Sequence, residues 1–256
     1  MTWYAWIAVF FFGAVWGSFF CTLALRFIDG SFDRNAAAAL FTPSRCPHCG
    51  SRISPAHLVP LIGYLLLRGR CGRCGKKISY LYPSFEIICG TLLVAAVANG
   101  GIGIFPFVMY LIMCVAITIS LIDLKTLTIP NTLVAACALL SIYPVLHTTS
   151  LKSGLLGAAG MFCFFVLILL LFPGSFGGGD AKFATAIGLL CGIEMSIVVM
   201  ETALVTGSIA GIVYAWIMKK GLTTRIPFAP FLTAGLIAAH FFGRDIILLY
   251  HRITCR

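Results

Sequence analysis

Long apolar runs, interrupted by glycine, proline and short charged connectors, recur along most of this sequence. Hydrophobic residues make up 60% of its 256 residues and charged residues only 10%, which is far from the composition of a water-soluble domain. A helix of about 20 such residues crosses ~30 Å of hydrocarbon, so we expect an all-α polytopic membrane protein. The runs predict about eight transmembrane helices: 3–25, 84–99, 102–122, 132–147, 154–172, 183–195, 197–218 and 229–250. The end of the last one, which carries Arg244 and Asp245, could instead form an interfacial turn.

One long polar insertion follows the first apolar run and divides the chain into three expected parts. Residues 1–28 form the first transmembrane helix, 29–83 a small cytoplasmic domain, and 84–256 the remaining transmembrane domain. If the insertion is cytoplasmic, most of the 18 lysines and arginines face the cytoplasm, as the positive-inside rule requires. The exceptions are Lys152, Arg244, Arg252 and Arg256. Both termini should then lie on the non-cytoplasmic side.

The net charge of +10 does not indicate a nucleic-acid partner, because the basic residues lie in the connectors between apolar runs. There they orient the chain in the lipid bilayer, which is the partner that the composition predicts. We expect no nucleic-acid binding.

Four of the eleven cysteines form two C-x-x-C pairs within the insertion. Cys46 and Cys49 stand in "CPHCG", Cys71 and Cys74 in "CGRCG", and the stretch between the pairs is one residue beyond the usual window for zinc. Two such pairs can supply four thiolates to one tetrahedral, structural Zn²⁺, which a domain of this size needs to fold. The alternatives are free or disulfide-bonded thiols, which a cytoplasmic location disfavours, and a zinc ribbon that binds nucleic acid.

Two of the eight acidic residues, Asp123 and Asp180, each follow or end an apolar run on the same predicted side of the membrane. Ionisable groups at such positions are candidates for function because they are costly unless paired or hydrated. Two carboxylates at equal depth can share a proton and act as acid and base on a peptide bond, as in aspartyl proteases. The simpler alternative is that both are wetted helix-end residues, paired with Lys125 and Lys182.

The residues around these aspartates predict interrupted helices. Gly177, Gly178 and Gly179 directly precede Asp180, and Pro130 follows Asp123 in "DLKTLTIPN". Glycines can leave helical geometry and let an extended peptide approach the backbone. We therefore assign these residues to a substrate cleft.

Taken together, the motifs "GSFFCTLALR", "SRCPHCG", "LLLRGRCGRCG", "YPSFE", "DLKTLTIPN", "GGGDAKF" and "IPFAPFL" closely resemble those of the bacterial type IV prepilin peptidases. The resemblance implies a bifunctional inner-membrane enzyme. It would cleave the leader of type IV prepilins or pseudopilins on the cytoplasmic side, then N-methylate the new first residue, commonly Phe, with S-adenosylmethionine. Asp123 and Asp180 match the catalytic pair, and the four-cysteine domain matches family members that have methyltransferase activity.

The resemblance also extends to residues whose roles are less evident from their chemistry. Glu86 and Gly90, in "YPSFEIICG", match a family motif and are candidates for methyl transfer, although a snorkelling glutamate and a helix-packing glycine are the simpler readings. Pro227, Phe228 and Pro230 are candidates for the substrate cleft, or they merely open the last helix. Cys21 stands where the family usually has asparagine.

Two other functions remain open from the sequence. The two aspartates could form the ion site of a transporter. Alternatively, the chain could be a methyltransferase or an assembly scaffold with a vestigial peptidase site.

Overall fold

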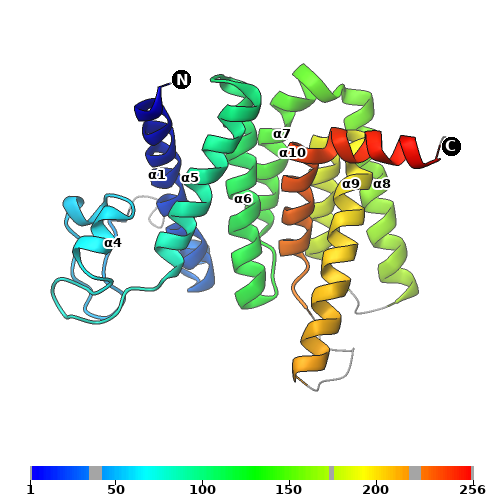
Figure 1. The fold of residues 1–256 in the computed structure, drawn as a ribbon. Helices are drawn as coiled ribbons and strands as arrows, with labels where there is room; N and C mark the ends of the chain where they lie inside the picture. Colours follow the sequence, from blue (N-terminus) through cyan, green and yellow to red (C-terminus); the bar gives the residue numbers. More distant parts are fainter. Residues whose placement is uncertain (1, 35–41, 173–175, 219–225, 255–256) are drawn as a thin grey trace. The chain divides into compact units, whose positions relative to one another are not determined.

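The fold comes from a computed structural model, which describes residues 2–34, 42–172, 176–218 and 226–254. Seven of the described helices are long and apolar enough to cross a membrane, so the expected polytopic all-α architecture is confirmed. The chain forms two compact units, 1–110 and 111–256, and the division falls within α6. The elements, drawn in Figure 1, are α1 (Trp3–Ile28), α2 (Ser31–Arg34), the 3-10 helix η1 (Pro55–Leu58), α4 (Ile62–Leu66), α5 (Leu81–Gly100), α6 (Ile104–Thr126), α7 (Asn131–Pro144), the π-helix η2 (Val145–Thr149), α8 (Leu151–Leu171), α9 (Gly178–Met218) and α10 (Ala229–Thr254).

The sixth and seventh expected spans both lie in α9. Gly192 has φ 71° and ψ 179°, a conformation that breaks the helix and that glycine adopts without a steric penalty. The break separates 178–191 from 193–218, so α9 contains two helical segments and the expectation of about eight is met. The sequence had placed the boundary slightly later, between 195 and 197.

Side chains from the preceding helices take over hydrogen bonds that the break in α9 leaves unmade. The Ser153 hydroxyl oxygen accepts from the Ile193 N–H at 3.3 Å. The Thr149 hydroxyl donates to the Leu190 carbonyl at 3.0 Å. In the hydrocarbon core of a membrane such side-chain hydrogen bonds are required, because no water is present to bond the free backbone N–H and C=O groups.

In the first unit, α1 packs against α5 through glycines that let the two backbones approach closely. A Cβ atom at Gly13 would lie 2.9 Å from the Cys89 carbonyl oxygen, and one at Gly17 would lie 2.7 Å from that of Phe85. Spaced four residues apart, these glycines form the small-residue contact typical of membrane helix pairs. On α5, Gly90 in turn faces the ring of Phe10.

In the second unit, α9 packs against α8 and α10 by the same kind of contact. A Cβ atom at Gly157 of α8 would lie 2.4 Å from the Gly188 carbonyl oxygen, and one at Gly235 of α10 would lie 2.5 Å from that of Val199. The C-terminal part of α10, drawn in red in Figure 1, bends away from its first part. This bend fits the expected interfacial turn near Arg244.

Two glycines one turn apart on α8 allow a matched test of this packing. We expect Gly157→Ala to lower the melting temperature of the detergent-solubilised protein, because the new methyl group meets a backbone oxygen. A Cβ atom at Gly160 would meet no atom within 4 Å, so Gly160→Ala should be neutral or should stabilise by up to about 1 kcal/mol. Equal melting temperatures for the two variants would contradict this packing.

Candidate functional site

Asp123 lies in the last turn of α6, where its carboxylate is buried within the second unit. Its side chain is 5% exposed, and its Oδ2 accepts a hydrogen bond from the Ala229 N–H at 3.1 Å. Ala229 is the first residue of α10 and stands within "IPFAPFL". The segment that opens the last helix thus supplies a backbone donor to the first candidate aspartate.

Asp180 lies in the first turn of α9 and is 9% exposed. Its Oδ2 accepts a hydrogen bond from the Gly177 N–H at 2.9 Å, so the carboxylate caps the beginning of its own helix. Its Oδ1 is buried and has no hydrogen-bond partner among the described residues. A buried carboxylate oxygen without a partner is costly, which marks this atom as a site for an exchangeable group such as water.

The two carboxylates are near enough to interact electrostatically. They come from the end of one helix and the beginning of another, and a backbone amide outside that helix binds one oxygen of each. The structure therefore brings together the pair that the sequence singled out. Their catalytic roles stay a prediction.

The glycines before Asp180 differ from expectation. Because α9 begins at Gly178, the prediction that all three interrupt the helix is wrong for Gly178 and Gly179. Packing explains why position 179 is a glycine, since a Cβ atom there would lie 2.9 Å from the Cβ of Ile129. A Cβ atom at Gly178 would face open space. Gly177 and Gly178 are exposed, which is compatible with a place in a substrate cleft.

Lys182 joins the two aspartate-bearing segments through a contact that the sequence did not indicate. Its Nζ donates to the Asn131 Oδ1 at 3.0 Å, rather than pairing with Asp180 as the simpler alternative had it. Asn131 begins α7 directly after Pro130, which is half-buried. The contact therefore holds the loop that follows Asp123 against the start of α9.

Phe228 lies in an aromatic cluster that holds three segments together. Its ring centroid is 4.7 Å from that of Phe176, which precedes the glycines, and 5.8 Å from that of Phe165 on α8. Phe228 is buried, so its position favours a packing role over contact with substrate. Pro227 and Pro230 on either side of it are half-buried.

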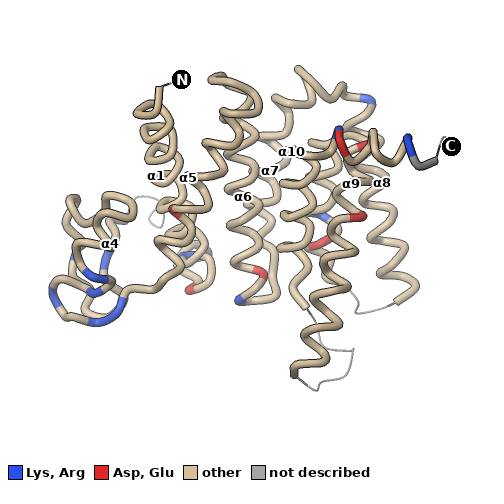
Figure 2. The backbone as a smooth tube through the Cα atoms, in the orientation of Figure 1, with Lys and Arg blue, Asp and Glu red and all other residues tan. Residues whose placement is uncertain are grey.

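The first unit holds the four paired cysteines in one cluster. Their Sγ atoms all lie within 4.8 Å of one another, and those of Cys46 and Cys74 are 3.9 Å apart. Four sulfurs at about 2.3 Å from a tetrahedral ion would be separated by about 3.8 Å, so this cluster fits a metal ion and is far too open for disulfides. Figure 2 shows that the backbone around the cluster carries many basic positions and no acidic one from 42 to 80.

Both C-x-x-C pairs adopt the same local fold. The Gly50 N–H donates to the Cys46 carbonyl at 2.9 Å, and the Gly75 N–H donates to the Cys71 carbonyl at 2.8 Å. Both glycines have positive φ, 67° and 70°, as the tight turn requires. Two independent stretches of chain thus form equivalent half-sites.

Local hydrogen bonds favour thiolates in the cluster. The backbone N–H groups of Cys74 and Arg73 lower the pKa of the Cys71 thiol to about 6. For Cys74, the Lys76 N–H lowers the pKa, but desolvation and the other three thiols raise it to about 11. Hydrogen bonding therefore favours a thiolate at Cys71, whereas desolvation and the neighbouring thiols oppose one at Cys74.

The candidate methyl-transfer residues lie on α5, where both have partners within the first unit. Glu86 is buried, and its Oε2 accepts from the Leu61 N–H at 2.7 Å. Leu61 has φ 60° and precedes α4, so the carboxylate supports a strained turn of the four-cysteine region. The close contact of Gly90 with Phe10 favours helix packing, and Cys21 is fully buried on α1.

Sequence reasoning missed the partners of these groups. These partners are ordinary residues whose importance depends on tertiary contacts: Leu61, Ile129, Asn131 and Ala229. Three of them had a signal, because Ile129 and Asn131 lie in "DLKTLTIPN" and Ala229 lies in "IPFAPFL".

Two family models match the chain. That of the bacterial peptidase A24 N-terminal domain covers residues 11–99, which include the four cysteines and Glu86. That of the type IV leader peptidase family covers residues 110–216, which include both aspartates. No solved structure matches the chain significantly.

Curated relatives match over most of their length. A prepilin leader peptidase/N-methyltransferase of Bacillus subtilis (strain 168) is 30% identical over 256 aligned residues, which cover 96% of this chain and 98% of the relative. A protein of the same name in Burkholderia pseudomallei (strain 1026b) is 32% identical, and the alignment covers 80% of this chain and 69% of the relative. A third, in Legionella pneumophila, is also 32% identical, and the alignment covers 82% of this chain and 76% of the relative.

The Glu86–Leu61 hydrogen bond gives a structural test that is independent of activity. We expect Glu86→Ala to speed hydrogen exchange of the amides near Leu61, because a charged acceptor worth about 1.5–3 kcal/mol is removed. Glu86→Gln keeps an acceptor and should show a smaller effect. The measurement is hydrogen exchange of the full chain, read by mass spectrometry. Equal exchange rates near Leu61 in the unaltered protein and in both variants would contradict the contact.

Proposed function

The chain belongs to the type IV leader peptidase family, and from this membership we propose that it is a bifunctional enzyme of the bacterial inner membrane. It cleaves the leader peptide of type IV prepilins or pseudopilins at the cytoplasmic side. It then methylates the new N-terminal amine, commonly that of Phe. The names of the curated relatives support both activities.

The observation that carries the peptidase proposal is the buried pair Asp123 and Asp180, with its unpartnered Asp180 Oδ1. Two neighbouring carboxylates cannot both ionise cheaply, so they hold one proton between them. The ionised member takes a proton from a water molecule whose oxygen attacks the scissile carbonyl carbon. The protonated member donates its proton to the leaving nitrogen as the C–N bond breaks.

The contacts around the pair support this chemistry by fixing its geometry. The Ala229 and Gly177 amides each hold one carboxylate oxygen. The aromatic cluster of Phe228 holds the segments that carry these donors, and the Lys182–Asn131 contact holds the loop that follows Asp123. Exposed Gly177 and Gly178 leave backbone accessible beside Asp180, where we propose that the extended leader lies.

The methyl group would come from S-adenosylmethionine, which supplies an electrophilic methyl to the free amine. We propose that the four-cysteine region serves this second activity and binds one structural Zn²⁺. Closed tetrahedral coordination by four thiolates leaves no position for substrate, which agrees with a structural role. We propose that Glu86 is a positioning residue, because its carboxylate accepts the hydrogen bond from Leu61 that holds the turn before α4 in place.

Orientation in the membrane is part of the proposal. The distribution of lysine and arginine supports a cytoplasmic four-cysteine region and both termini on the non-cytoplasmic side. Asp123 and Asp180 then lie at the cytoplasmic ends of their helices.

Removing either candidate carboxylate tests the peptidase proposal. We expect Asp123→Asn and Asp180→Asn each to lower the cleavage rate by at least about 10²–10⁴-fold, the usual contribution of acid–base catalysis. The measurement is leader loss from a purified prepilin, read by mass spectrometry. Asp245→Asn is the matched control, because Asp245 is exposed on α10 and its substitution should leave cleavage unchanged.

Normal cleavage by both aspartate variants would refute the dyad. Loss of cleavage together with a collapse of the melting temperature would point to a structural role for that residue. Ion flux into proteoliposomes without any peptidase activity would favour the transporter alternative.

Metal content tests the zinc proposal. Elemental analysis should find about one zinc per chain in the purified protein, and Cys71→Ser should abolish it because a closed site needs all four thiolates. Cys163→Ser, an exposed thiol on α8, should retain the metal.

Acidification should release the metal as well, because protons compete for the thiolates. In the metal-free cluster, hydrogen bonds from the Cys74 and Arg73 N–H groups lower the pKa of the Cys71 thiol to about 6, so this thiolate is available to a metal ion below the ordinary thiol range. A metal content that does not change on acidification, or that is equal in both cysteine variants, would refute this site.

A further inference from the structure

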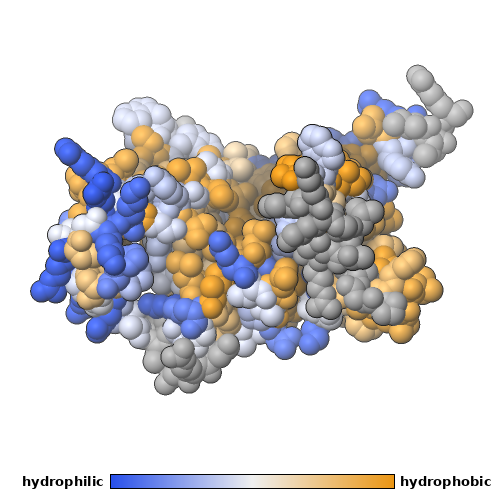
Figure 3. Space-filling model, turned by 90° about the horizontal axis from the view of Figure 1, so that it is seen from below, coloured by the Kyte–Doolittle hydropathy of each residue, from blue (hydrophilic) through white to orange (hydrophobic). Residues whose placement is uncertain are grey.

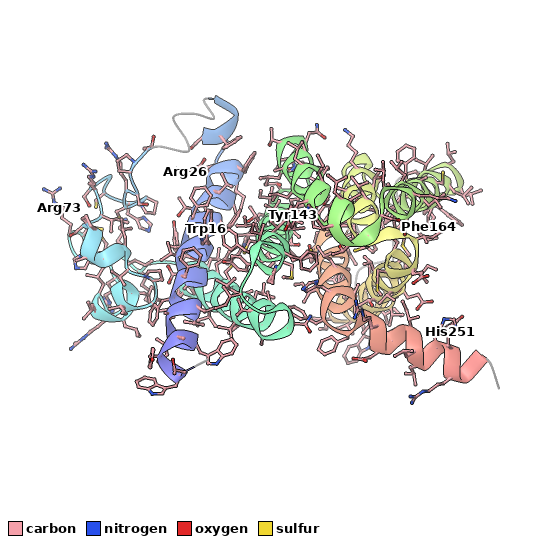
Figure 4. All side chains as sticks on the ribbon, turned by 90° about the horizontal axis from the view of Figure 1, so that it is seen from above. Trp16, Arg26, Arg73, Tyr143, Phe164 and His251 are labelled. Atoms are coloured by element: carbon pink, nitrogen blue, oxygen red, sulfur yellow. The ribbon has the colours of Figure 1, made fainter. Side chains whose placement is uncertain are left out.

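The four-cysteine region, residues 42–80, carries basic side chains and no acidic ones. Its basic residues are Arg45, Arg52, Arg68, Arg70, Arg73, Lys76 and Lys77. Four thiolates on a divalent ion would carry a net charge of −2, which leaves the region strongly positive. Figure 3 shows hydrophilic side chains gathered over this region, and Figure 4 shows Arg73 pointing away from it.

The same region exposes a continuous apolar segment along η1 and α4. We call it the α4 ridge, and it consists of Leu58, Val59, Ile62, Leu65 and Leu66. Leu65 and Leu66 are 71% and 69% exposed, and the other three are each more than 40% exposed. So many adjacent large apolar side chains on a small domain indicate a surface that something covers.

The position of the α4 ridge in the first unit places it beside the ends of two helices that are long and apolar enough to span a membrane. The Leu61 N–H, within the ridge, is bonded to Glu86 in the second turn of α5. Arg26 at the end of α1 donates to the Thr42 carbonyl at 2.7 Å, which ties down the start of the region. Tyr80 leads directly into α5. These contacts keep α4 beside the ends of two membrane-spanning helices.

A small cavity lies between α4 and the basic loop that follows it. Its volume is about 140 Å³, and Tyr64, Arg68, Arg70, Lys77 and Tyr80 are among the residues that line it. Three cations and two phenol groups around such a cavity favour a compact anion. An anionic lipid headgroup has that chemistry and would be delivered to this location by the bilayer.

We propose that the four-cysteine region docks on the surface of an anionic bilayer. The α4 ridge inserts its leucines among the acyl chains, and the basic residues around the cavity bind the headgroup phosphates. The two halves of this surface match the two layers of a membrane interface, apolar beneath and negative above. The docked region would be held at a fixed depth beside α5. This inference goes beyond cleavage and methyl transfer and depends on neither.

The test is hydrogen exchange of the full-length protein in lipid nanodiscs, read by mass spectrometry on peptides that cover the α4 ridge. Nanodiscs of phosphatidylcholine are compared with nanodiscs in which roughly one third of the lipid is phosphatidylglycerol. We expect slower exchange of the ridge in the anionic nanodiscs. The difference should shrink in about 1 M salt, where charges more than about 3 Å apart are screened.

Two double variants separate the contributions of insertion and charge. Leu65→Ser with Leu66→Ser should lose protection in both lipids, and because these side chains are 71% and 69% exposed, the change removes little buried apolar area. Arg70→Gln with Lys77→Gln should lose the extra protection in phosphatidylglycerol, by about fivefold for each charge removed. Lys125→Gln is the matched control, because this exposed lysine lies in the second unit and should leave the ridge unchanged.

Metal content of each variant reports whether the region remains folded. Equal exchange in both lipids for the unaltered protein would overturn the proposal. Protection that survives both double variants would overturn it as well. Inorganic phosphate added to phosphatidylcholine nanodiscs distinguishes the source of the anion, and equal protection by phosphate alone would show a soluble-anion site in place of a membrane surface.

Discussion

This structure depends on one constraint: backbone N–H and C=O groups in an apolar environment must form their hydrogen bonds within the protein, because no water is there to form them. Within a helix the backbone N–H and C=O groups bond to one another. Where a helix ends in an apolar environment, the free backbone groups need other hydrogen-bond partners. The three carboxylates that are buried among the residues the structure describes all act in this way. Asp123 accepts from Ala229, Asp180 from Gly177 and Glu86 from Leu61, so each carboxylate joins a helix to the backbone of a segment outside it. The candidate catalytic and positioning groups thus occur where the helical pattern ends.

This constraint explains why the sequence was so informative about the fold and less so about the site. Hydrophobic length alone predicts the spans, and C-x-x-C spacing predicts the metal cluster, because both signals are local. The two aspartates were identifiable because charges are rare in this chain. The boundary inside α9 was displaced by a few residues, since an apolar run does not show which glycine adopts a positive φ.

The remaining parts of the site depend on contacts between distant segments. Gly179 was read as a helix breaker, yet it is helical and is small because Ile129 lies against it. Phe228 was read as a cleft residue, yet it packs on Phe176 and Phe165. Nothing in the spacing of these residues distinguishes the two readings. Only the packing of the second unit does so.

The equivalent half-sites of the four-cysteine cluster have a further consequence for the first unit. A metal ion held by the four cysteines would cross-link the connection between α1 and α5. A cross-link removes conformations from the unfolded connection and so lowers the entropy cost of closing the loop between the two helices. The glycine contacts of Gly13 and Gly17 then form between helices that are already tethered at short range. Metal binding in the connection would therefore raise the effective concentration of one helix for the other.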